Sequence, residues 1–400
     1  MYQGKNIKEQ SKIFIKLLLP VLIYQIISYS SSMIGTFMAG HYSPTDLAGV
    51  SMGVNIWNPV MYTLNSIVLA IVPIVSQLIG KGREQEIPTK VRQFLYIAVF
   101  ISIILIIGLN TLAEPIVNSL GMDENIARVT KKYLFYESIG VLPIFLYVVL
   151  RAFMDSLGLT GLSMIMMVIS VPVNVLLAYG FIFGKLGMPE LGGAGNGMAV
   201  SLTYTVLFFI ALFLTLNHPK INKYKIFEKE GIKFTHWLEI FKLGVPIAIA
   251  TALETVVFST LSLMVSRFDT TIIASHQAAL NFSGFLYSLP VSVANTVTII
   301  VAYHVGAKNY KMAKRYTLLG VIMGMIFAFI AGLIVWIFDS NIPYLYSKDL
   351  GVIALTAHLL LYAIGFAICD SFASALAGVL RGYKKVIPIC VAMFIGYYLV

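Results

Sequence analysis

Long apolar stretches separated by short polar segments make up most of the chain. Because a helix needs about 20 apolar residues to cross a bilayer, ten of these stretches predict membrane spans. A further apolar run begins near Val386 and is still too short to span when the sequence stops at Val400, so we expect the chain to end within an eleventh span. The sequence predicts an all-α polytopic membrane protein. The ten predicted spans are 17–40, 47–80, 93–113, 133–153, 162–184, 194–216, 238–266, 272–304, 316–339 and 352–380.

Two of these runs, 47–80 and 272–304, are long enough to hold two spans each. Splitting either one would invert every later loop and destroy a clear charge bias. With a cytoplasmic N-terminus, 22 of the 28 basic residues fall in inward loops, as the positive-inside rule requires. We therefore predict one long helix per run and a protein in the cell membrane with its N-terminus inside. The outward loops hold Arg128, Lys131, Lys132, Lys185, Arg267 and Lys348.

Composition agrees with a membrane protein and restricts its partners. Hydrophobic residues make up 58% of the chain, charged residues 12%, and the mean hydropathy is +0.87, outside the range of soluble domains. The net charge of +10 is explained by the loop bias, so it does not indicate a nucleic-acid partner. Cys369 and Cys390 lie in apolar segments without metal-ligand spacing. We expect a monomer in contact with lipids and without a cofactor.

The sequence also contains an internal duplication. The pattern Lys-Leu-x-x-Pro at residues 16–20 recurs at 242–246, an offset of 226 positions, and Gly80 recurs as Gly306 at the same offset. Span 1 then pairs with span 7, so both halves have the same orientation in the membrane, as in parallel transporter repeats. This predicts two pseudo-symmetric six-helix lobes and twelve spans in total. The predicted parts are a first lobe over 1–217, a cytoplasmic linker over 218–242 and a second, truncated lobe over 243–400.

Two acidic residues, Glu254 and Asp370, interrupt long apolar stretches of the second half. Glu254 lies almost midway between Lys242 and Arg267, the nearest basic residues on either side. Asp370 precedes Arg381 by about three turns of a helix. Both therefore fall near the middle of a span, where a charged side chain costs at least about 2.5–3.5 kcal/mol and usually lines an ion or substrate pathway. A structural carboxyl held neutral by its neighbours is the alternative. As a pair, the two acids could bind Na⁺, which favours oxygen ligands.

Other polar residues inside the spans are weaker candidates. Asn281, Gln277 and Asn174 could contact a cation or substrate, although hydrogen bonding between helices explains such residues equally well. His276 could carry a proton or serve a structural role. Pro20 and Pro246 interrupt the hydrogen bonding of spans 1 and 7 and are candidate kinks that act in gating.

Several motifs together resemble the MATE family of multidrug and toxic compound extrusion transporters, and most closely its NorM branch. The resemblance covers the whole chain. The motifs are Met38-Ala39-Gly40, Pro73-x-x-x-Gln77-x-x-Gly80-x-Gly82, Ile182-Phe183-Gly184-Lys185-x-Gly187-x-Pro189-Glu190-Leu191-Gly192-Gly193, Ala274-Ser275-His276-Gln277-x-Ala279-Leu280-Asn281 and Leu380-Arg381-Gly382-Tyr383-Lys384.

This resemblance implies a twelve-helix antiporter that expels cationic and amphipathic drugs in exchange for Na⁺ or H⁺. It further implies that Glu254 and Asp370 occupy the cation site of the second lobe. The chain departs from the NorM pattern at two places, where Gly35 replaces an aspartate of span 1 and Phe366 replaces a tyrosine of span 10. The first lobe would then lack a carboxylate in the middle of a span, which favours Na⁺ coupling through the second.

Three other functions remain open on sequence grounds. A lipid-linked or metabolite exporter, such as a flippase, would share the two-lobed plan, although such a cavity would carry basic residues that these spans lack. A passive channel would also use buried polar groups. An intramembrane hydrolase or transferase would need a nucleophile or metal motif, and no HExxH or GxSxG motif is present. We therefore expect a transporter and not an enzyme.

Overall fold

The structure is a computed structural model that describes residues 2–265, 268–338, 341–345 and 349–399. Arg267 and Lys348, two basic residues predicted to lie outside, are not among them. Within the described ranges all regular structure is helical, as expected for apolar segments that must satisfy their backbone hydrogen bonds internally. In the same ranges, ten helical segments are long and apolar enough to cross a membrane, which confirms the ten predicted spans.

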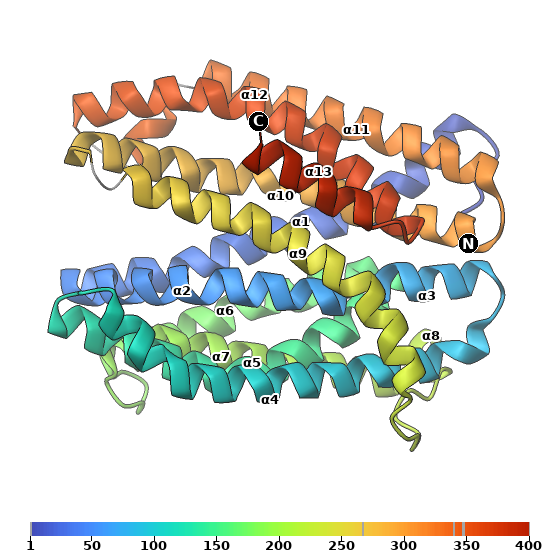
Figure 1. Cartoon of the computed structure of the whole chain (residues 1–400), viewed down its shortest axis with the longest axis horizontal. Coiled ribbons are helices and arrows are strands. Elements are labelled where there is room, and N and C mark those ends of the chain that lie inside the picture. The colour runs from blue at the N-terminus through green and yellow to red at the C-terminus, as the bar shows by residue number, and fades with distance from the viewer. Residues whose placement is uncertain (1, 266–267, 339–340, 346–348, 400) are drawn as a thin grey trace. The chain divides into compact units, whose positions relative to one another are not determined.

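Most of these helices begin and end within a few residues of the predicted limits, but α1 begins at Ile7 and α5 at Glu124, nine to ten residues before the predicted spans 17–40 and 133–153. The short helix α13 falls below the length required of a span. The bounds are α1 (Ile7–Tyr42), α2 (Pro44–Leu69), α3 (Ile71–Gly80), α4 (Ile87–Ser119), α5 (Glu124–Ser156), α6 (Thr160–Phe183), α7 (Gly195–Asn217), α8 (Pro219–Asn222), α9 (Phe234–Val265), α10 (Thr270–Gly306), α11 (Tyr310–Ile337), α12 (Leu350–Gly382) and α13 (Ile387–Tyr398), with short 3₁₀ turns at Glu84–Glu86, Gly192–Ala194 and Ile342–Leu345 (Figure 1).

Polar side chains at the loop boundaries cap several of the helices. Ser43 Oγ accepts hydrogen bonds from the backbone N–H groups of Thr45 and Asp46 at the start of α2. Asp349 does the same for Gly351 and Val352 at the start of α12. Each cap satisfies donors that the first helical turn leaves without a partner. Polar residues of the segments between the apolar runs thus cap the first turn of several spans.

The predicted single helix over 47–80 is interrupted, whereas the one over 272–304 is continuous. The first run forms α2 and α3, with a break at Ala70. Pro73 explains the break, because its nitrogen carries no hydrogen to donate to the carbonyl of Leu69, four residues earlier. The second run is the single helix α10, which contains Pro290 without a break.

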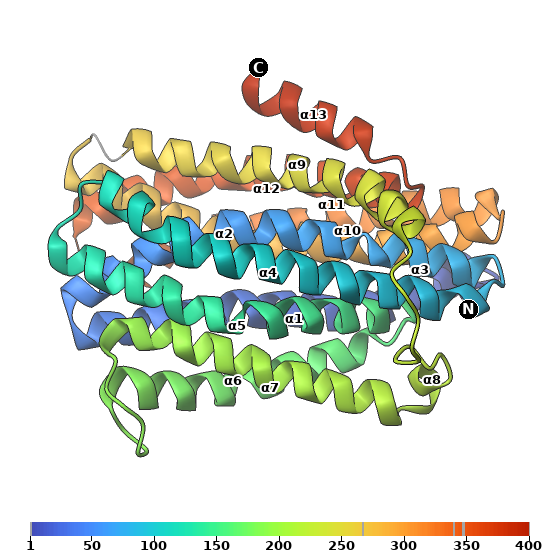
Figure 2. The ribbon, with the colours of Figure 1, turned by 60° about the horizontal axis from the view of Figure 1, so that its bottom comes forward.

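The chain divides into two compact units. Unit 1 comprises residues 1–29, 76–82 and 253–400, and unit 2 comprises 30–75 and 83–252. In unit 1, α10 packs against α11 and α12, and in unit 2, α5 packs against α2, α4 and α7; the helices of each group run side by side in Figures 1 and 2. The units cut through α1 and α9, so the division into lobes at 1–217 and 243–400 stays a prediction.

Within unit 1, α3 and α10 cross at very close range through two glycines. A Cβ atom on Gly80 would lie 1.9 Å from the carbonyl oxygen of Tyr303, and one on Gly306 would lie 2.2 Å from that of Gln77. Residue 303 follows residue 77 by 226 positions, and residue 306 follows residue 80 by the same offset. The contact is therefore two-fold symmetric, as expected if the two halves of the sequence are structural repeats.

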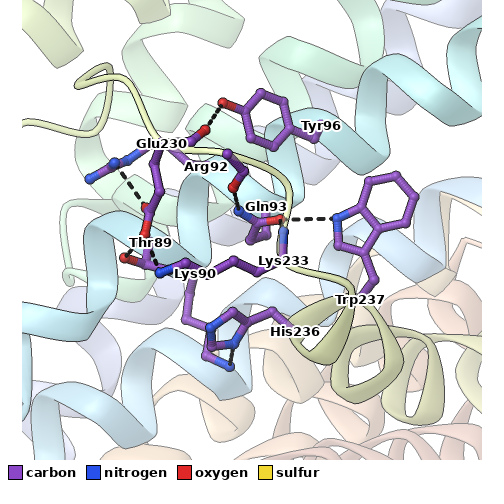
Figure 3. Close-up of polar contacts among 10 residues, drawn as sticks. Thr89, Lys90, Arg92, Gln93, Tyr96, Glu230, Lys233, His236 and Trp237 are labelled. Atoms are coloured by element: carbon purple, nitrogen blue, oxygen red, sulfur yellow. Dashed lines mark hydrogen bonds and ion pairs between the residues drawn. The ribbon is translucent and has the colours of Figure 1, made fainter.

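Within unit 2, the linker between α7 and α9 is held against α4 (Figure 3). Gln93 is fully buried and makes three hydrogen bonds. Its Nε2 donates to the carbonyl of Gly231, and its Oε1 accepts from the backbone N–H of Lys233 and from Trp237 Nε1. One amide side chain thus pairs with three groups of the linker and of the first turn of α9.

Charged pairs surround this amide. Arg92 Nη1 lies 2.9 Å from Glu230 Oε2. The Glu230 carboxylate also accepts a hydrogen bond from Thr89 Oγ1. The side chain of Lys90, 7% exposed, pairs with Glu239 and contacts His236. The cytoplasmic linker of the sequence prediction is therefore an ordered part of unit 2.

We expect the contribution of Glu230 to stability to depend on pH. The hydrogen bond from Lys233 lowers the pKa of the Glu230 carboxyl, with smaller effects from Thr89 and Arg92. A lowered pKa means that the stabilisation is complete above the unfolded value of about 4.3 and is lost as the pH falls through the folded value. Glu230→Gln should cost about 1 kcal/mol at pH 7 and nothing measurable well below pH 4.

Melting temperatures of detergent-purified protein between pH 7 and pH 3.5 test this expectation. The exposed Glu228, which lies 3.8 Å from Lys225, supplies the control Glu228→Gln, for which we expect little change. A difference between wild type and Glu230→Gln that does not shrink on acidification would contradict the assignment.

Candidate cation site

Glu254 and Asp370 lie close together in unit 1. Glu254 is on α9 and is partly buried, whereas Asp370 is on α12 and is 9% exposed. The two carboxyl groups are near enough to interact electrostatically. Sequence spacing placed each in the middle of its own span, and the fold brings the two helices together at these residues.

Hydroxyl groups from neighbouring positions bind the two acids. Tyr287 on α10 hydrogen-bonds Glu254, and Ser374, one turn further along α12, hydrogen-bonds Asp370. Tyr397 on α13 interacts electrostatically with both carboxylates. Asp370 Oδ2 is nevertheless buried without a hydrogen-bond partner among the described residues, although buried polar atoms are nearly always paired.

Arg381, in the last turn of α12, supplies the positive charge of the cluster. It attracts Glu254 and interacts with Tyr287. When both acids are ionised, the cluster carries two negative charges and one positive charge. The net charge of −1, together with a carboxylate oxygen available for a ligand, suits a single monovalent cation held by carboxylate and hydroxyl oxygens.

Sequence reasoning assigned no part in the site to four members of this cluster, Arg381, Ser374, Tyr287 and Tyr397. Arg381 follows Asp370 by about three turns and so lies on the same face of a helix with 3.6 residues per turn. Ser374, four residues after Asp370, shares that face for the same reason. Tyr287 had no comparable signal, because nothing in the sequence predicts which face of α10 meets α9.

The amide candidates lie in two places. In unit 1, Gln277 Nε2 donates to Asn281 Oδ1 at 3.3 Å, and the backbone carbonyl of Asn281 accepts from Tyr29. In unit 2, Asn174 Nδ2 donates to Thr203 at 3.3 Å, while its Oδ1 is buried and has no partner in the described part of the chain. These bonds agree with the structural interpretation of the amides, and a role in binding stays a prediction.

The remaining sequence candidates also have defined places. His276 is partly buried on α10. Pro20 lies inside α1 and Pro246 inside α9, at the interior positions that their proposed role as kinks requires. Phe366, which replaces a tyrosine of the family pattern, packs edge-on against Phe258 with ring centroids 6.1 Å apart. Position 366 therefore contributes an apolar contact and no ligand oxygen.

A neighbouring side chain fills the place where position 35 would carry the family's acid. A Cβ atom on Gly35 would lie 1.6 Å from Asn196 Oδ1, and Asn196 is 3% exposed. A side chain at position 35 and the observed conformation of Asn196 therefore exclude each other. A buried amide from α7 thus occupies the space that a side chain at position 35 would need.

The expectation that the first lobe lacks a carboxylate in the middle of a span is wrong. Glu137 lies near the middle of α5 and is 1% exposed. Lys132, only five residues earlier, makes the apolar run begin at residue 133, so the predicted span places Glu137 near its end and not in its middle. The helix in fact begins at Glu124, so Lys132 lies within it.

Unit 2 also contains an apolar cavity of about 590 Å³ that is open to the surface, since Phe37 in its wall is 69% exposed. Methionine and aromatic side chains dominate its walls, and such side chains adapt to flat lipophilic molecules. The cavity lies between α1 and the end of α6 and is lined by Met33, Ile34, Phe37, Met38, His41 and Phe183.

Comparison with known proteins identifies relatives over the full length. A family model described as MatE matches residues 20–180 and 246–400, and the starts of its two matches are separated by the offset of the duplication. A protein from Oceanobacillus iheyensis named "Probable multidrug resistance protein NorM" is 39% identical over 401 residues, covering 100% of this chain and 90% of that protein. One of the same name from Streptococcus pneumoniae is 40% identical over 399 residues, covering 100% and 88%.

The fold is also found among solved structures. The crystal structure of the eukaryotic MATE transporter AtDTX14 superimposes with a TM-score of 0.88 at 19% identity, covering 97% of this chain and 86% of that one. At this level of identity the match concerns the fold alone. It agrees with the helical architecture of this chain.

Proposed function

The chain belongs to the MatE family, and we propose that it is a secondary multidrug efflux transporter that exports cationic and amphipathic drugs in exchange for Na⁺. The names of its relatives support multidrug export. The proposed cation site consists of Glu254 and Asp370, with the N-terminus of the chain in the cytoplasm. The observation that carries the proposal is that the two acids lie close together and that Asp370 Oδ2 has no hydrogen-bond partner among the described residues.

The charge of the cluster supports coupling to a single monovalent ion. Arg381 offsets one of the two carboxylates, so one cation makes the site neutral. One such ion moving down about 150 mV releases roughly 3.5 kcal/mol, at about 2.3 kcal/mol per 100 mV. At about 1.4 kcal/mol per tenfold ratio, this energy sustains a concentration ratio of roughly 300 for a neutral drug.

The apolar cavity of unit 2 supports the proposed substrate class. Its volume of about 590 Å³ falls within the range of sites for drug-sized molecules. The described residues that line it offer methionine and aromatic contacts and no acidic or basic side chain other than His41. We propose that it accepts the lipophilic part of an amphipathic cation, which needs no fixed polar partners.

Transport into proteoliposomes tests this function. The purified protein is reconstituted and given a Na⁺ gradient at equal pH, with a fluorescent lipophilic cation as the probe. We expect uphill movement of the dye that stops when an ionophore dissipates the Na⁺ gradient. Downhill movement alone would indicate a channel. Gradient-driven transport of anionic lipid-linked molecules but not of the dye would favour the alternative exporter.

A further inference from the structure

Glu137 in unit 2 is a buried acid that the proposed cation site does not use. Its Oε1 accepts a hydrogen bond of 2.8 Å from Tyr133 on the same helix, and its Oε2 is buried with no hydrogen-bond partner among the residues that the structure describes. The Tyr133 side chain is 3% exposed. No Lys, Arg or His among the described residues forms an ion pair with Glu137.

Asp155 on the same helix shows what a charge-matched buried acid looks like. It is 7% exposed, but both of its oxygens have partners. Oδ2 lies 2.9 Å from Arg151, and Oδ1 accepts from Ser163 at 2.6 Å. Arg151 therefore compensates the charge of an ionised Asp155, whereas an ionised Glu137 would be an unpaired buried charge, which costs several kcal/mol.

Within the described ranges, the helices that pack against α5 bring no compensating cation to Glu137. Tyr62 of α2 interacts electrostatically with Tyr133, and Tyr204 of α7 packs edge-on against Tyr147. The other titratable side chains of these helices have their own contacts. On α2, Asp46 accepts a hydrogen bond from the backbone N–H of Gly193, and on α6, Tyr179 lies beside Phe183. On α4, Lys90 pairs with Glu239, Arg92 with Glu230 and Glu114 with Lys131. Tyr96, also on α4, donates to the carbonyl of Glu230.

From this environment we infer that Glu137 is a proton-carrying site, separate from Glu254 and Asp370, through which H⁺ contributes to drug export. A proton removes the charge of Glu137 without requiring further ligands. A metal cation would need several oxygens around it, and the hydroxyl of Tyr133 is the only hydrogen-bond partner that the described residues offer the Glu137 carboxyl. The inference rests on the proposed efflux function and adds a second coupling ion in unit 2.

The surrounding interface is specific enough to hold this carboxyl in place. A Cβ atom on Gly53 of α2 would lie 2.4 Å from the ring of Tyr133, and one on Gly197 of α7 would lie 2.7 Å from its carbonyl oxygen. Ser201 of α7 donates to the carbonyl of Tyr136 at 2.7 Å. Close approach on both sides fixes Tyr133, and with it the hydrogen bond to Glu137.

The test separates the two coupling ions in proteoliposomes of the full chain. One arm imposes a pH gradient without Na⁺ and records proton movement with an entrapped pH dye on addition of a lipophilic cation. The other arm imposes a Na⁺ gradient at equal pH. We expect Glu137→Gln to reduce drug-dependent proton movement at least tenfold and to change Na⁺-driven transport less than twofold. Glu137→Asp, which keeps a carboxyl, should restore most of the proton movement.

Asp155→Asn is the matched control, because it neutralises a buried acid of the same helix whose charge is already paired. The yield of Asp155→Asn serves as the folding reference. Per folded molecule, the ratio of its drug-dependent proton movement to its Na⁺-driven transport should equal that of wild type. Proton movement that persists in Glu137→Gln would overturn the inference. So would equal loss of both arms in well-folded Glu137→Gln protein, which would make the residue structural. Absence of the Na⁺ arm in wild type would instead refute the proposed Na⁺ coupling.

Discussion

Glu254→Gln and Asp370→Asn should each abolish Na⁺-driven drug export, with a loss of at least tenfold, while the protein still inserts and folds. Arg381 neutralises one carboxylate, so removing either acid leaves a cluster with no net charge. Nothing then remains to attract a cation into an apolar span. Initial rates of dye transport under a fixed Na⁺ gradient, normalised to folded protein, measure the effect.

The same charge argument predicts that Arg381→Gln strengthens Na⁺ binding, whereas removing either acid weakens it. This variant leaves two uncompensated acids, so the Na⁺ concentration that gives half-maximal transport should fall, and ion release should slow turnover. Cys369→Ser, at an exposed position beside Asp370, should behave like wild type. Normal Na⁺-driven export by Glu254→Gln and Asp370→Asn would remove these residues from the coupling mechanism.

Gly80→Ala and Gly306→Ala should each destabilise the protein severely. Each added methyl group would meet a backbone carbonyl oxygen of the other helix, at 1.9 and 2.2 Å respectively. Backbone atoms cannot rotate away as side chains do, so α3 and α10 would have to separate. Overpacking of a core usually costs about 1–3 kcal/mol, and we expect the upper end of that range or more, seen as a lower melting temperature and a smaller monodisperse fraction.

Two other helical glycines provide the controls. A Cβ atom added to Gly108 in α4 or to Gly365 in α12 would meet no atom of the described chain within 4 Å. Alanine there should be neutral or stabilising by up to about 1 kcal/mol, because alanine favours the helix. Equal tolerance of alanine at all four positions would show that the crossing at Gly80 and Gly306 is looser than these distances indicate.

The spans could be predicted because each follows from a local property, the length of an apolar run. The charge bias of the loops resolved the two long runs into single crossings. The break at Ala70 was not predicted, since a proline inside an apolar run does not always interrupt a helix. Pro290 in α10 shows this, because that helix continues through it. The ordered linker could not be predicted either, because the contacts of Gln93 join residues about 140 positions apart.

The candidate site was predictable in its acids and not in its surroundings. Glu254 and Asp370 stood out because a charge in the middle of an apolar run is costly wherever it lies. Tyr287 and Tyr397 are amphipathic residues common in membrane helices, so only the packing of α9, α10, α12 and α13 identifies them. Glu137 did not stand out in the sequence, because two adjacent lysines precede it closely. Distance along the chain from a basic residue is a poor measure of burial inside a helix bundle.

The two-fold crossing of Gly80 and Gly306 has the form of a homodimer interface, in which residue i of one copy meets residue j of the other and the reverse. In a true homodimer one codon sets both halves of such a contact, and any acid gained in one copy appears in both. Fusion into a single polypeptide removes that constraint. Each half can then mutate alone wherever the shared crossing is untouched, and serine at position 28 opposite glutamate at 254 is what such independent drift produces.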